Sequence, residues 1–262
     1  MTVAYQGHAG AFSDVAARAL APSAQTRGYP SFDAAIDALD RGEVDAAVLP
    51  VENAIAGSVP RNYELIWERP ALRIHDETVL PVEMCLIGVP GATIEGLAEI
   101  RSHPVALEQV RRFADRYPTW RRTTTTDTAG AVREIVTGGD PTIAAVGPAL
   151  AAELYAGAIL ARNVQDEVEN YTRFFLLRRG EAAPGGTRAC VGIEIQDRPG
   201  SLRDALSAFA DRAIDLRFLI ARPDHRIPFR YRFFCELTNV DAPRLHAALE
   251  EIGGDQRVLG HY

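Results

Sequence analysis

The sequence predicts an α/β protein with a two-lobed first part and a smaller module at its C-terminal end. Strand-like and helix-like segments alternate along residues 1–181, which is typical of sheets covered by helices. A Pro/Gly-rich break, EAAPGGT, follows at residues 181–187 and is the best linker candidate. Residues 188–262 then give the order βαββαβ, which is typical of a ferredoxin-like module.

The N-terminal segments carry the clearest strand and helix signals. Residues 2–6 are typical of a strand, and the apolar run at residues 44–51 is typical of a buried strand. Apolar side chains recur at helical spacing in residues 12–19 and again in residues 32–39, where Ser31 is a favourable N-cap. This alternation favours a largely parallel sheet in the first lobe.

The second lobe is expected at residues 78–154, and the first lobe at residues 1–77 and 155–181. The expected elements are an extended segment at 78–88, helices at 105–113 and 129–136, and strands at 142–146, 158–161 and 174–177. We expect the last two strands to return to the first lobe, so that a cleft lies between the lobes.

The C-terminal module is expected to hold strands and helices of ordinary length. The strands are predicted at residues 189–195, 216–221 and 231–237, with a last short strand after them, and the helices at residues 202–209 and 245–252. Such a module leaves sheet edges and a helix-free face for pairing, so we expect a homodimer or a homotetramer.

The charged residues exclude several classes of protein. All 28 basic residues are arginine, so chemistry that needs a lysine amine is excluded, including Schiff-base catalysis, pyridoxal-phosphate catalysis and P-loop nucleotide binding. The net charge of −7 argues against nucleic acid as a partner. The sequence holds neither the run of ~20 apolar residues that spans a membrane nor an export signal. We therefore expect a cytoplasmic protein with no membrane partner.

The cysteines and histidines do not predict a metal centre. Cys85, Cys190 and Cys235 lie far apart and form no CxxC pair, so neither a disulfide framework nor a zinc site is indicated. The six histidines are also scattered, with no HxxxH or HExxH spacing. We expect no metal and no cofactor.

Three segments place polar residues where ligands often bind, and each also has a purely structural interpretation. Residues 5–13, YQGHAGAFS, form a glycine-rich turn before a helix, which suits an anion site completed by Ser13 or a simple helix cap. Asn53 follows a buried strand, where α/β sheets bind ligands, but turn residues are also common there. Gln109 lies in a helix that begins after Ser102, and there it is equally typical of a solvent-facing side chain.

The sharpest local feature is the segment Asn170-Tyr171-Thr172-Arg173-Phe174. It places a hydroxyl, a fixed cation and an aromatic ring beside the start of an apolar strand. The planar guanidinium of Arg173 suits a carboxylate. The alternative interpretation is an ordinary strand edge, where threonine and arginine are also common.

Five segments together resemble prephenate dehydratases in the order and spacing of that family. They are YQGHAGAFSDVAA, LPVENAIAGSV, SHPVALEQV, DTAGAV and the stretch AAELYAGAILARNVQDEVENYTRF. Residues 188–262 are similar to an ACT domain through RPGSLRDALSAFADRAIDL and ARPDHRIPFRYRFF. Two positions depart from the family pattern, because Ala54 replaces a serine and Val105 replaces a glutamine.

The resemblance implies a fold and a chemistry for residues 1–181. The fold would be a two-lobed domain like that of periplasmic binding proteins, with a central cleft. The chemistry would be the cofactor-independent dehydration and decarboxylation of prephenate to phenylpyruvate in L-phenylalanine biosynthesis, in which Thr172 assists the departing hydroxide. Glu52 and His103 are alternative acids. The substrate-binding residues would be Ser13, Asn53, Gly57, Ser102, Gln109, Arg173 and Phe174.

The ACT resemblance implies allosteric control by an amino-acid effector. The effector-binding residues would be Asp197, Pro199, Gly200, Ser201, Leu202, Arg222 and Pro223. The family's ESRP motif reads Ile220-Ala221-Arg222-Pro223 here, so a buried acceptor is replaced by an apolar side chain. We therefore expect feedback by phenylalanine to be weak, absent or moved to another ligand.

Two other functions remain open from the sequence. Arogenate dehydratase shares the reaction and differs in whether the substrate bears an amino or a keto group. A non-catalytic small-molecule sensor is the other alternative, since two-lobed domains and ACT modules also occur as binding devices. Retention of Thr172, Arg173, Asn53 and Gln109 argues against the sensor.

Overall fold

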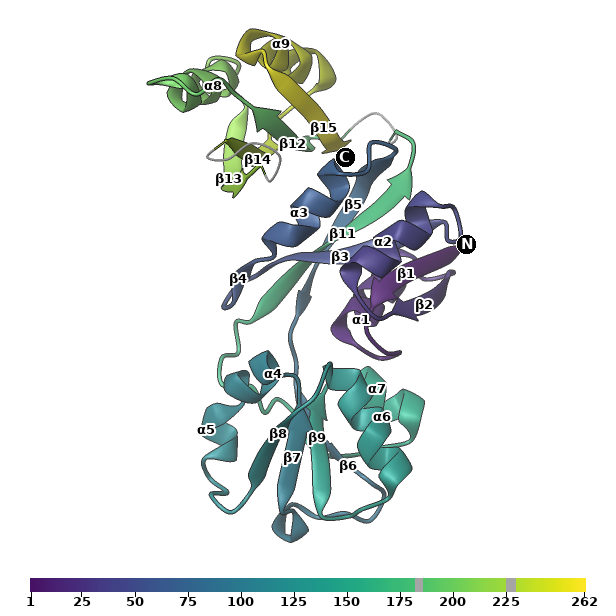
Figure 1. Ribbon diagram of the computed structural model, residues 1–262. Coiled ribbons are helices and arrows are strands. Elements are labelled where there is room, and N and C mark those ends of the chain that lie inside the picture. The colour runs from purple at the N-terminus through teal and green to yellow at the C-terminus, as the bar shows by residue number, and fades with distance from the viewer. Residues whose placement is uncertain (182–185, 225–229) are drawn as a thin grey trace. The chain divides into compact units, whose positions relative to one another are not determined.

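The computed structural model describes residues 1–181, 186–224 and 230–262 (Figure 1). Residues 182–185 of the expected linker and residues 225–229 of the ARPDHRIPFRYRFF segment therefore lie outside the described residues. The chain divides into two compact units, Met1–Ser58 with Thr78–Phe174, and Val59–Glu77 with Phe175–Tyr262. Helices and strands alternate in both units, which confirms the expected α/β class.

The first sheet of unit one is built around the N-terminal strand. β1 (Thr2–Gln6) pairs in parallel with β2 (Gln25–Tyr29) and with β3 (Ala46–Asn53). The Ser31 hydroxyl accepts the Ala34 N–H at 3.1 Å, which confirms the expected N-cap of α2. The remaining elements here are α1 (Phe12–Leu20), α2 (Phe32–Asp40) and β4 (Gly57–Ser58), which pairs antiparallel with β3. Because β1, β2 and β3 run parallel, the C-terminal end of β3 lies at the edge of the sheet where parallel sheets bind ligands.

The second sheet of unit one has the strand order β10-β6-β9-β7-β8. Its strands are β6 (Cys85–Gly88), β7 (Glu99–Ser102), β8 (Arg121–Thr124), β9 (Ile143–Gly147) and β10 (Ala158–Ala161). Its helices are α4 (Pro104–Gln109), α5 (Arg111–Ala114), α6 (Thr128–Gly138) and α7 (Ala149–Tyr155), with the 3₁₀ turn η1 (Ile94–Gly96). All strands of this sheet except β10 lie within residues 78–154, the range expected for the second lobe.

Two expectations for this lobe were wrong. The helix expected at residues 105–113 is interrupted at Val110, where φ is −115° and ψ is 21°, so α4 and α5 are separate. Val110 is fully buried beside Trp120 in the lobe's core, and this packing outweighs the helical periodicity. The strand at residues 158–161 does not return to the first lobe, because β10 pairs antiparallel with β6.

The two lobes of unit one touch through the segment between β1 and α1. Ala11 belongs to the buried cluster that α6 and α7 form with β6 and β9, and Phe12 packs against the other core of the second lobe. A Cβ on Gly10 would lie 2.7 Å from the Cα of Ala151, so this approach requires a glycine. The first lobe thus contacts both cores of the second.

Unit two contains the expected βαββαβ module. Its strands are β12 (Arg188–Glu194), β13 (Asp215–Pro223), β14 (Tyr231–Thr238) and β15 (Asp255–His261), and its helices are α8 (Ser201–Ala210) and α9 (Ala242–Ile252). The sheet is antiparallel in the order β13-β14-β12-β15, which confirms the ferredoxin-like topology. Two further strands, β5 (Leu72–Pro81) and β11 (Tyr171–Arg179), connect the units along the chain.

The face of this sheet opposite α8 and α9 is covered by α3 (Pro60–Trp67), a helix that the sequence analysis missed. The indole ring of Trp67 fills the space over Gly192, where an added Cβ would lie 2.5 Å from the ring. The Arg232 guanidinium lies over the same ring at 4.3 Å, a favourable cation–π distance. The helix-free face on which we based the expected pairing is therefore covered by the chain itself.

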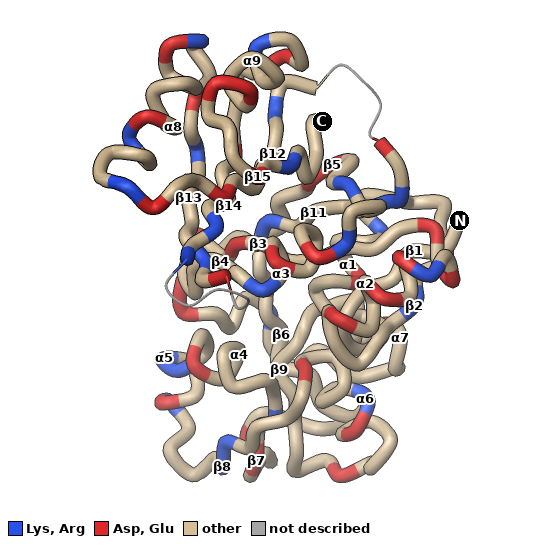
Figure 2. The backbone as a smooth tube through the Cα atoms, turned by 45° about the horizontal axis from the view of Figure 1, so that its top comes forward, with Lys and Arg blue, Asp and Glu red and all other residues tan. Residues whose placement is uncertain are grey.

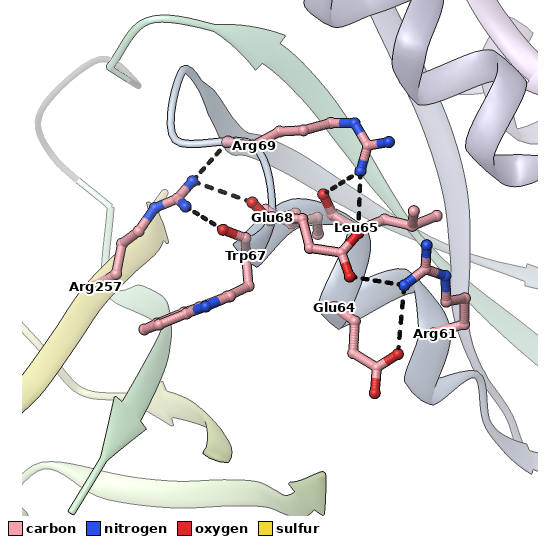
Figure 3. Close-up of polar contacts among 8 residues, drawn as sticks. Arg61, Glu64, Leu65, Trp67, Glu68, Arg69 and Arg257 are labelled. Atoms are coloured by element: carbon pink, nitrogen blue, oxygen red, sulfur yellow. Dashed lines mark hydrogen bonds and ion pairs between the residues drawn. The ribbon is translucent and has the colours of Figure 1, made fainter. Parts of the chain in front are cut away.

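Arginine side chains also hold the C-terminal end of α3 (Figure 3). The Arg257 guanidinium of β15 donates to the Trp67 carbonyl, to that of Ile66 at 3.0 Å and to that of Arg69 at 2.7 Å. A cation at this end of a helix satisfies carbonyls that lack helical partners and complements the helix dipole. Arg61 donates to Glu68 at 2.8 Å in the same helix region (Figure 3). Acidic and basic positions are interspersed along the backbone of both units (Figure 2).

Candidate active site

Asn53, the last residue of β3, organises the sharpest polar cluster in unit one. Its Nδ2 donates to Asn170 Oδ1 at 2.8 Å, to Thr172 Oγ1 at 2.9 Å and to the Tyr171 carbonyl at 3.1 Å. Its Oδ1 accepts the backbone N–H groups of Ile55 at 3.1 Å and Ala56 at 2.8 Å. The amide therefore has both of its ends occupied by the protein.

These contacts determine how the Thr172 hydroxyl is used. An amide nitrogen only donates, so Thr172 Oγ1 must accept the bond from Asn53. The hydroxyl proton of Thr172 is then available to another acceptor. Thr172 is half-buried, which leaves room for such an acceptor in a bound substrate.

Arg173 forms an ion pair next to this cluster. Its guanidinium donates to Glu52 Oε2 at 3.1 Å, and the side chains of Arg173 and Glu52 are 15% and 43% exposed. A carboxylate and a shielded guanidinium thus lie beside Asn53 and Thr172. The structure brings four residues of the sequence analysis together here, namely Glu52, Asn53, Thr172 and Arg173.

Gly57 has a local role in the turn that follows β3. It pairs with Asn53 across β3 and β4, and its φ of +84° is a conformation that non-glycine residues rarely adopt. The turn returns the chain so that Ile55 and Ala56 can donate to Asn53. Gly57 thus shapes the cluster through the backbone.

The other expected substrate-binding residues have contacts of their own. The Ser102 hydroxyl is fully buried and donates to the Val146 carbonyl at 2.6 Å. Gln109 ends α4, and its backbone carbonyl accepts the Asp166 N–H at 2.6 Å. Ser13 lies in the first turn of α1 and is 8% exposed, and Phe174 is 1% exposed in the core. Among the described residues, no hydrogen bond joins these four side chains to the Asn53 cluster.

The histidine proposed as an alternative acid caps a helix. His103 is the N-cap of α4, and its Nδ1 accepts the Val105 N–H at 3.3 Å. The His103 side chain thus has a structural role at the start of α4.

Two polar features of unit one escaped the sequence analysis. Asn170 is 1% exposed and bonded to Asn53, yet the sequence suggested no role for its side chain. His8 Nδ1 lies 2.6 Å from Asp127 Oδ2, while Asp127 Oδ1 accepts the Gly130 N–H at 2.7 Å and caps α6. Asp127 begins the DTAGAV motif, and an aspartate before a helix could have predicted the N-cap of α6. No local pattern could pair His8 with a residue so distant in sequence.

The expected effector-binding residues of unit two occupy two places. Gly200 precedes α8 with a φ of +85°, and the Ser201 hydroxyl donates to the Arg198 carbonyl at 3.0 Å. A cavity of about 240 Å³ adjoins this loop, lined by Ser201 and by the charged side chains of Arg198, Asp204 and Glu251. Arg222, on the edge strand β13, instead donates from Nε to Glu64 Oε1 of α3 at 2.6 Å.

No group of three or more His, Cys, Asp or Glu side chains in the described part of the chain is arranged to hold a metal ion. No described helix is both long enough and apolar enough to cross a membrane.

Comparison with known proteins assigns the family. Residues 3–182 match the family model described as prephenate dehydratase, and residues 191–252 match that of the ACT domain. The chain belongs to the prephenate dehydratase family. Its chemistry is that of a hydro-lyase, and the ACT domain is present as expected.

Relatives of this prephenate dehydratase family member include plant enzymes. Arogenate dehydratase/prephenate dehydratase 1, chloroplastic, of Arabidopsis thaliana is 35% identical over 281 residues, which cover 99% of this chain and 71% of the relative. Arogenate dehydratase 1 of Petunia hybrida is 36% identical over 283 residues, which cover 100% of this chain and 66% of the relative.

Two solved structures are similar over nearly the whole chain. Prephenate dehydratase of Arthrobacter aurescens, in complex with L-Phe, has a TM-score of 0.91 and 27% identity, covering 100% of this chain and 89% of that one. GqqA, described as a novel type of quorum quenching acylase, has a TM-score of 0.90 and 32% identity, covering 99% of this chain and 97% of that one.

Proposed function

We propose that this member of the family converts prephenate to phenylpyruvate, carbon dioxide and water. The Asn53–Thr172 hydrogen bond of 2.9 Å is the observation that supports the proposal, because it leaves the Thr172 proton for the leaving hydroxyl. The domain matches support a division in which residues 1–181 are catalytic and residues 188–262 are regulatory.

The proposed step needs one proton per turnover, which passes to the leaving oxygen through Thr172 and is restored to Thr172 from the solvent. The bond between the ring and its carboxylate breaks, its electron pair forms a new ring double bond, and the ring C–O bond breaks. The departing hydroxide takes a proton and leaves as water, and an aromatic ring remains. An aliphatic hydroxyl is a weak acid, so Thr172 acts as a positioned donor or relay to the leaving oxygen.

Arg173 has the chemistry to bind a substrate carboxylate. Its side chain is 15% exposed, so a contact with a carboxylate would be shielded from water and charge-assisted. Glu52 already accepts from the guanidinium at 3.1 Å, so a substrate carboxylate would have to share Arg173 with its protein partners or displace them.

Arogenate is the alternative substrate within the same reaction, and the names of the plant relatives favour it. The two substrates differ only in the side chain, which bears a keto group in prephenate and an ammonium group in arogenate. The decisive experiment supplies each substrate separately to the purified chain and follows phenylpyruvate and phenylalanine. Turnover of prephenate supports the proposal, turnover of arogenate alone supports the alternative, and turnover of neither overturns both.

Acyl hydrolysis is a second candidate function, favoured by the His8–Asp127 pair and by the similarity to the quorum quenching acylase. A carboxylate that orients a histidine is an arrangement that hydrolases use to activate a nucleophile. His8→Ala separates the two functions, because it should abolish acyl hydrolysis and leave dehydration intact. Loss of dehydration in that variant would place His8 in the dehydratase site instead.

Three further properties belong to the same proposal. An amino-acid effector acting through the ACT domain is supported by the L-Phe complex of the Arthrobacter aurescens relative. A reducing cytoplasm agrees with three buried cysteines that form no disulfide among the described residues, although the Arabidopsis thaliana relatives are named as chloroplastic. A homodimer or homotetramer is still supported by the two edge strands of the ACT sheet, β13 and β15, and light scattering of the purified chain would test it.

A further inference from the structure

We propose that Asn170 is a positioning residue for the Thr172 hydroxyl, acting through Asn53. This inference rests on the proposed dehydratase function and extends it to a buried residue whose side chain is bonded to Asn53. Asn170 Oδ1 accepts from Asn53 Nδ2 at 2.8 Å, and the same nitrogen donates to Thr172 Oγ1 at 2.9 Å.

The orientation of both amides follows from their neighbours. Oxygen and nitrogen of an asparagine amide look alike, so the hydrogen-bond partners must decide. The backbone N–H groups of Ile55 and Ala56 point at one end of the Asn53 amide, which must be its oxygen. The other end is then the NH₂ group, and the Asn170 atom that faces it must be an oxygen acceptor.

Asn170 supplies the acceptor that keeps the Asn53 NH₂ group in place. That group has only two hydrogens and three acceptors around it, so each acceptor limits how far the amide can turn. If Asn170 Oδ1 were absent, Asn53 could turn toward the Tyr171 carbonyl and release Thr172 Oγ1. The Thr172 hydroxyl would then be free to donate within the protein.

The burial of Asn170 supports a role beyond filling the core. The residue is 1% exposed, and its Nδ2 has no hydrogen-bond partner among the described residues. A buried donor without a partner is unfavourable, and an apolar residue of similar size would avoid that cost. The presence of an asparagine at position 170 is therefore explained better by the hydrogen bond that its Oδ1 accepts from Asn53 than by a contribution to stability.

The test compares Asn170→Ala with Asn170→Asp, since aspartate keeps an oxygen acceptor at the same place. Asn170→Ala should lower kcat on the order of tenfold or more with little change in KM, because a misplaced group mainly affects the transition state. Asn170→Asp should recover most of the lost kcat. Asn62→Ala is the matched control, because Asn62 is also fully buried but lies in α3.

A double mutant separates positioning from general destabilisation. If Asn170 acts through Thr172, adding Asn170→Ala to Thr172→Ala should change kcat little further, whereas independent effects would multiply. Multiplied losses, or a kcat in Asn170→Ala equal to that of the parent, would overturn the proposal.

A crystal structure of the Asn170→Ala variant tests the proposal without any assay. We expect Asn53 Nδ2 to have moved away from Thr172 Oγ1. An Asn53–Thr172 bond still at its present length would contradict the proposal even if the parent enzyme is active. If the parent acts on neither prephenate nor arogenate, the proposed function fails, while this measurement still decides the positioning role.

Discussion

Arg222 Nε donates to Glu64 Oε1 at 2.6 Å and so joins β13 of the ACT domain to α3. Phe218, Ile220 and Arg222 alternate along β13 and face the same side of the sheet, and the Phe218 ring stacks on Tyr63 of α3 at 5.4 Å. The effector motif of this chain is therefore partly engaged by a helix of its own unit.

This engagement leads to a prediction about feedback. Arg222 already has a carboxylate partner, and Ile220 cannot accept a hydrogen bond from the ammonium group of an amino acid. L-phenylalanine should therefore inhibit turnover weakly or not at all, as measured by titrating it against the initial rate. Ile220→Glu, which restores an acceptor, should strengthen any inhibition. Strong inhibition of the parent at low micromolar L-phenylalanine would contradict this account.

The buried hydroxyl of Tyr63 should stabilise the contact between α3 and the sheet. It donates to Glu236 Oε1 at 2.5 Å, and Tyr63 and Glu236 are 0% and 7% exposed. Tyr63→Phe removes a bond to a buried carboxylate, so the free energy of unfolding should fall by about 1–3 kcal/mol in urea titrations. Tyr231→Phe is the control, because Tyr231 is 48% exposed and its loss should matter little. Equal effects of both variants would contradict a role for the Glu236 bond.

Glu99 should make the second lobe sensitive to acid. Burial raises the pKa of this carboxyl, but hydrogen bonds from Arg101, Arg121 and Thr123 outweigh burial and lower the pKa from 4.5 to about 2. Because the unfolded chain then binds the proton more readily, the stability from ionised Glu99 is complete above pH 4.5 and is lost as the pH falls toward 2.

Urea titrations across this range of pH test the prediction. Glu99→Gln should be less stable than the parent near neutral pH, and its free energy of unfolding should fall less steeply between pH 4.5 and pH 2. Glu95→Gln, in the exposed turn η1, should follow the parent. Parallel curves for the parent and Glu99→Gln would show that Glu99 does not carry the acid sensitivity.

The Thr172 hydroxyl should act mainly in the transition state. Thr172→Ala should cost about 3 kcal/mol or more in activation free energy, roughly a hundredfold or greater loss in kcat, with the fold and KM nearly unchanged. Thr172→Ser keeps a hydroxyl within reach of Asn53 and should retain most of the activity. A normal kcat in Thr172→Ala would remove Thr172 from the proposed mechanism.

Local sequence patterns predicted the elements whose signals are local. The strand at residues 2–6 and the helix after Ser31 agree with β1 and α2 because alternation and capping are properties of neighbouring residues. The missed helix α3 carried a usable signal, with Pro60 at its first position and Tyr63, Ile66 and Trp67 at helical spacing.

Other features could not be predicted without the fold. β8 reads Arg-Arg-Thr-Thr and is a strand only because it pairs in parallel with β7 at the sheet edge. The site residues Asn53 and Thr172 were proposed from motifs, but their hydrogen bond joins positions 119 residues apart. The covering of the ACT sheet by α3 also depends on contacts between distant segments, and it removed the free face that we expected.

The ion pair between Arg173 and Glu52 allows two roles for Arg173 to be separated. If Arg173 binds a substrate carboxylate, Arg173→Ala should raise KM at least tenfold through the loss of a charge-assisted contact of about 1.5–3 kcal/mol. If Arg173 only holds Glu52 at 3.1 Å, Glu52→Gln should reproduce the effect of Arg173→Ala on KM.

We expect Arg173 to bind a substrate carboxylate, so Arg173→Ala should raise KM and Glu52→Gln should not. Glu52→Gln removes the competing carboxylate from the guanidinium, so KM should stay unchanged or fall even if kcat declines. Arg173→Lys keeps the charge without the planar fork and should recover only part of the affinity. Steady-state kinetics with the substrate that the enzyme turns over would give all three values. An unchanged KM in Arg173→Ala would show that Arg173 is structural, since a guanidinium that is 15% exposed cannot bind the substrate without affecting its affinity.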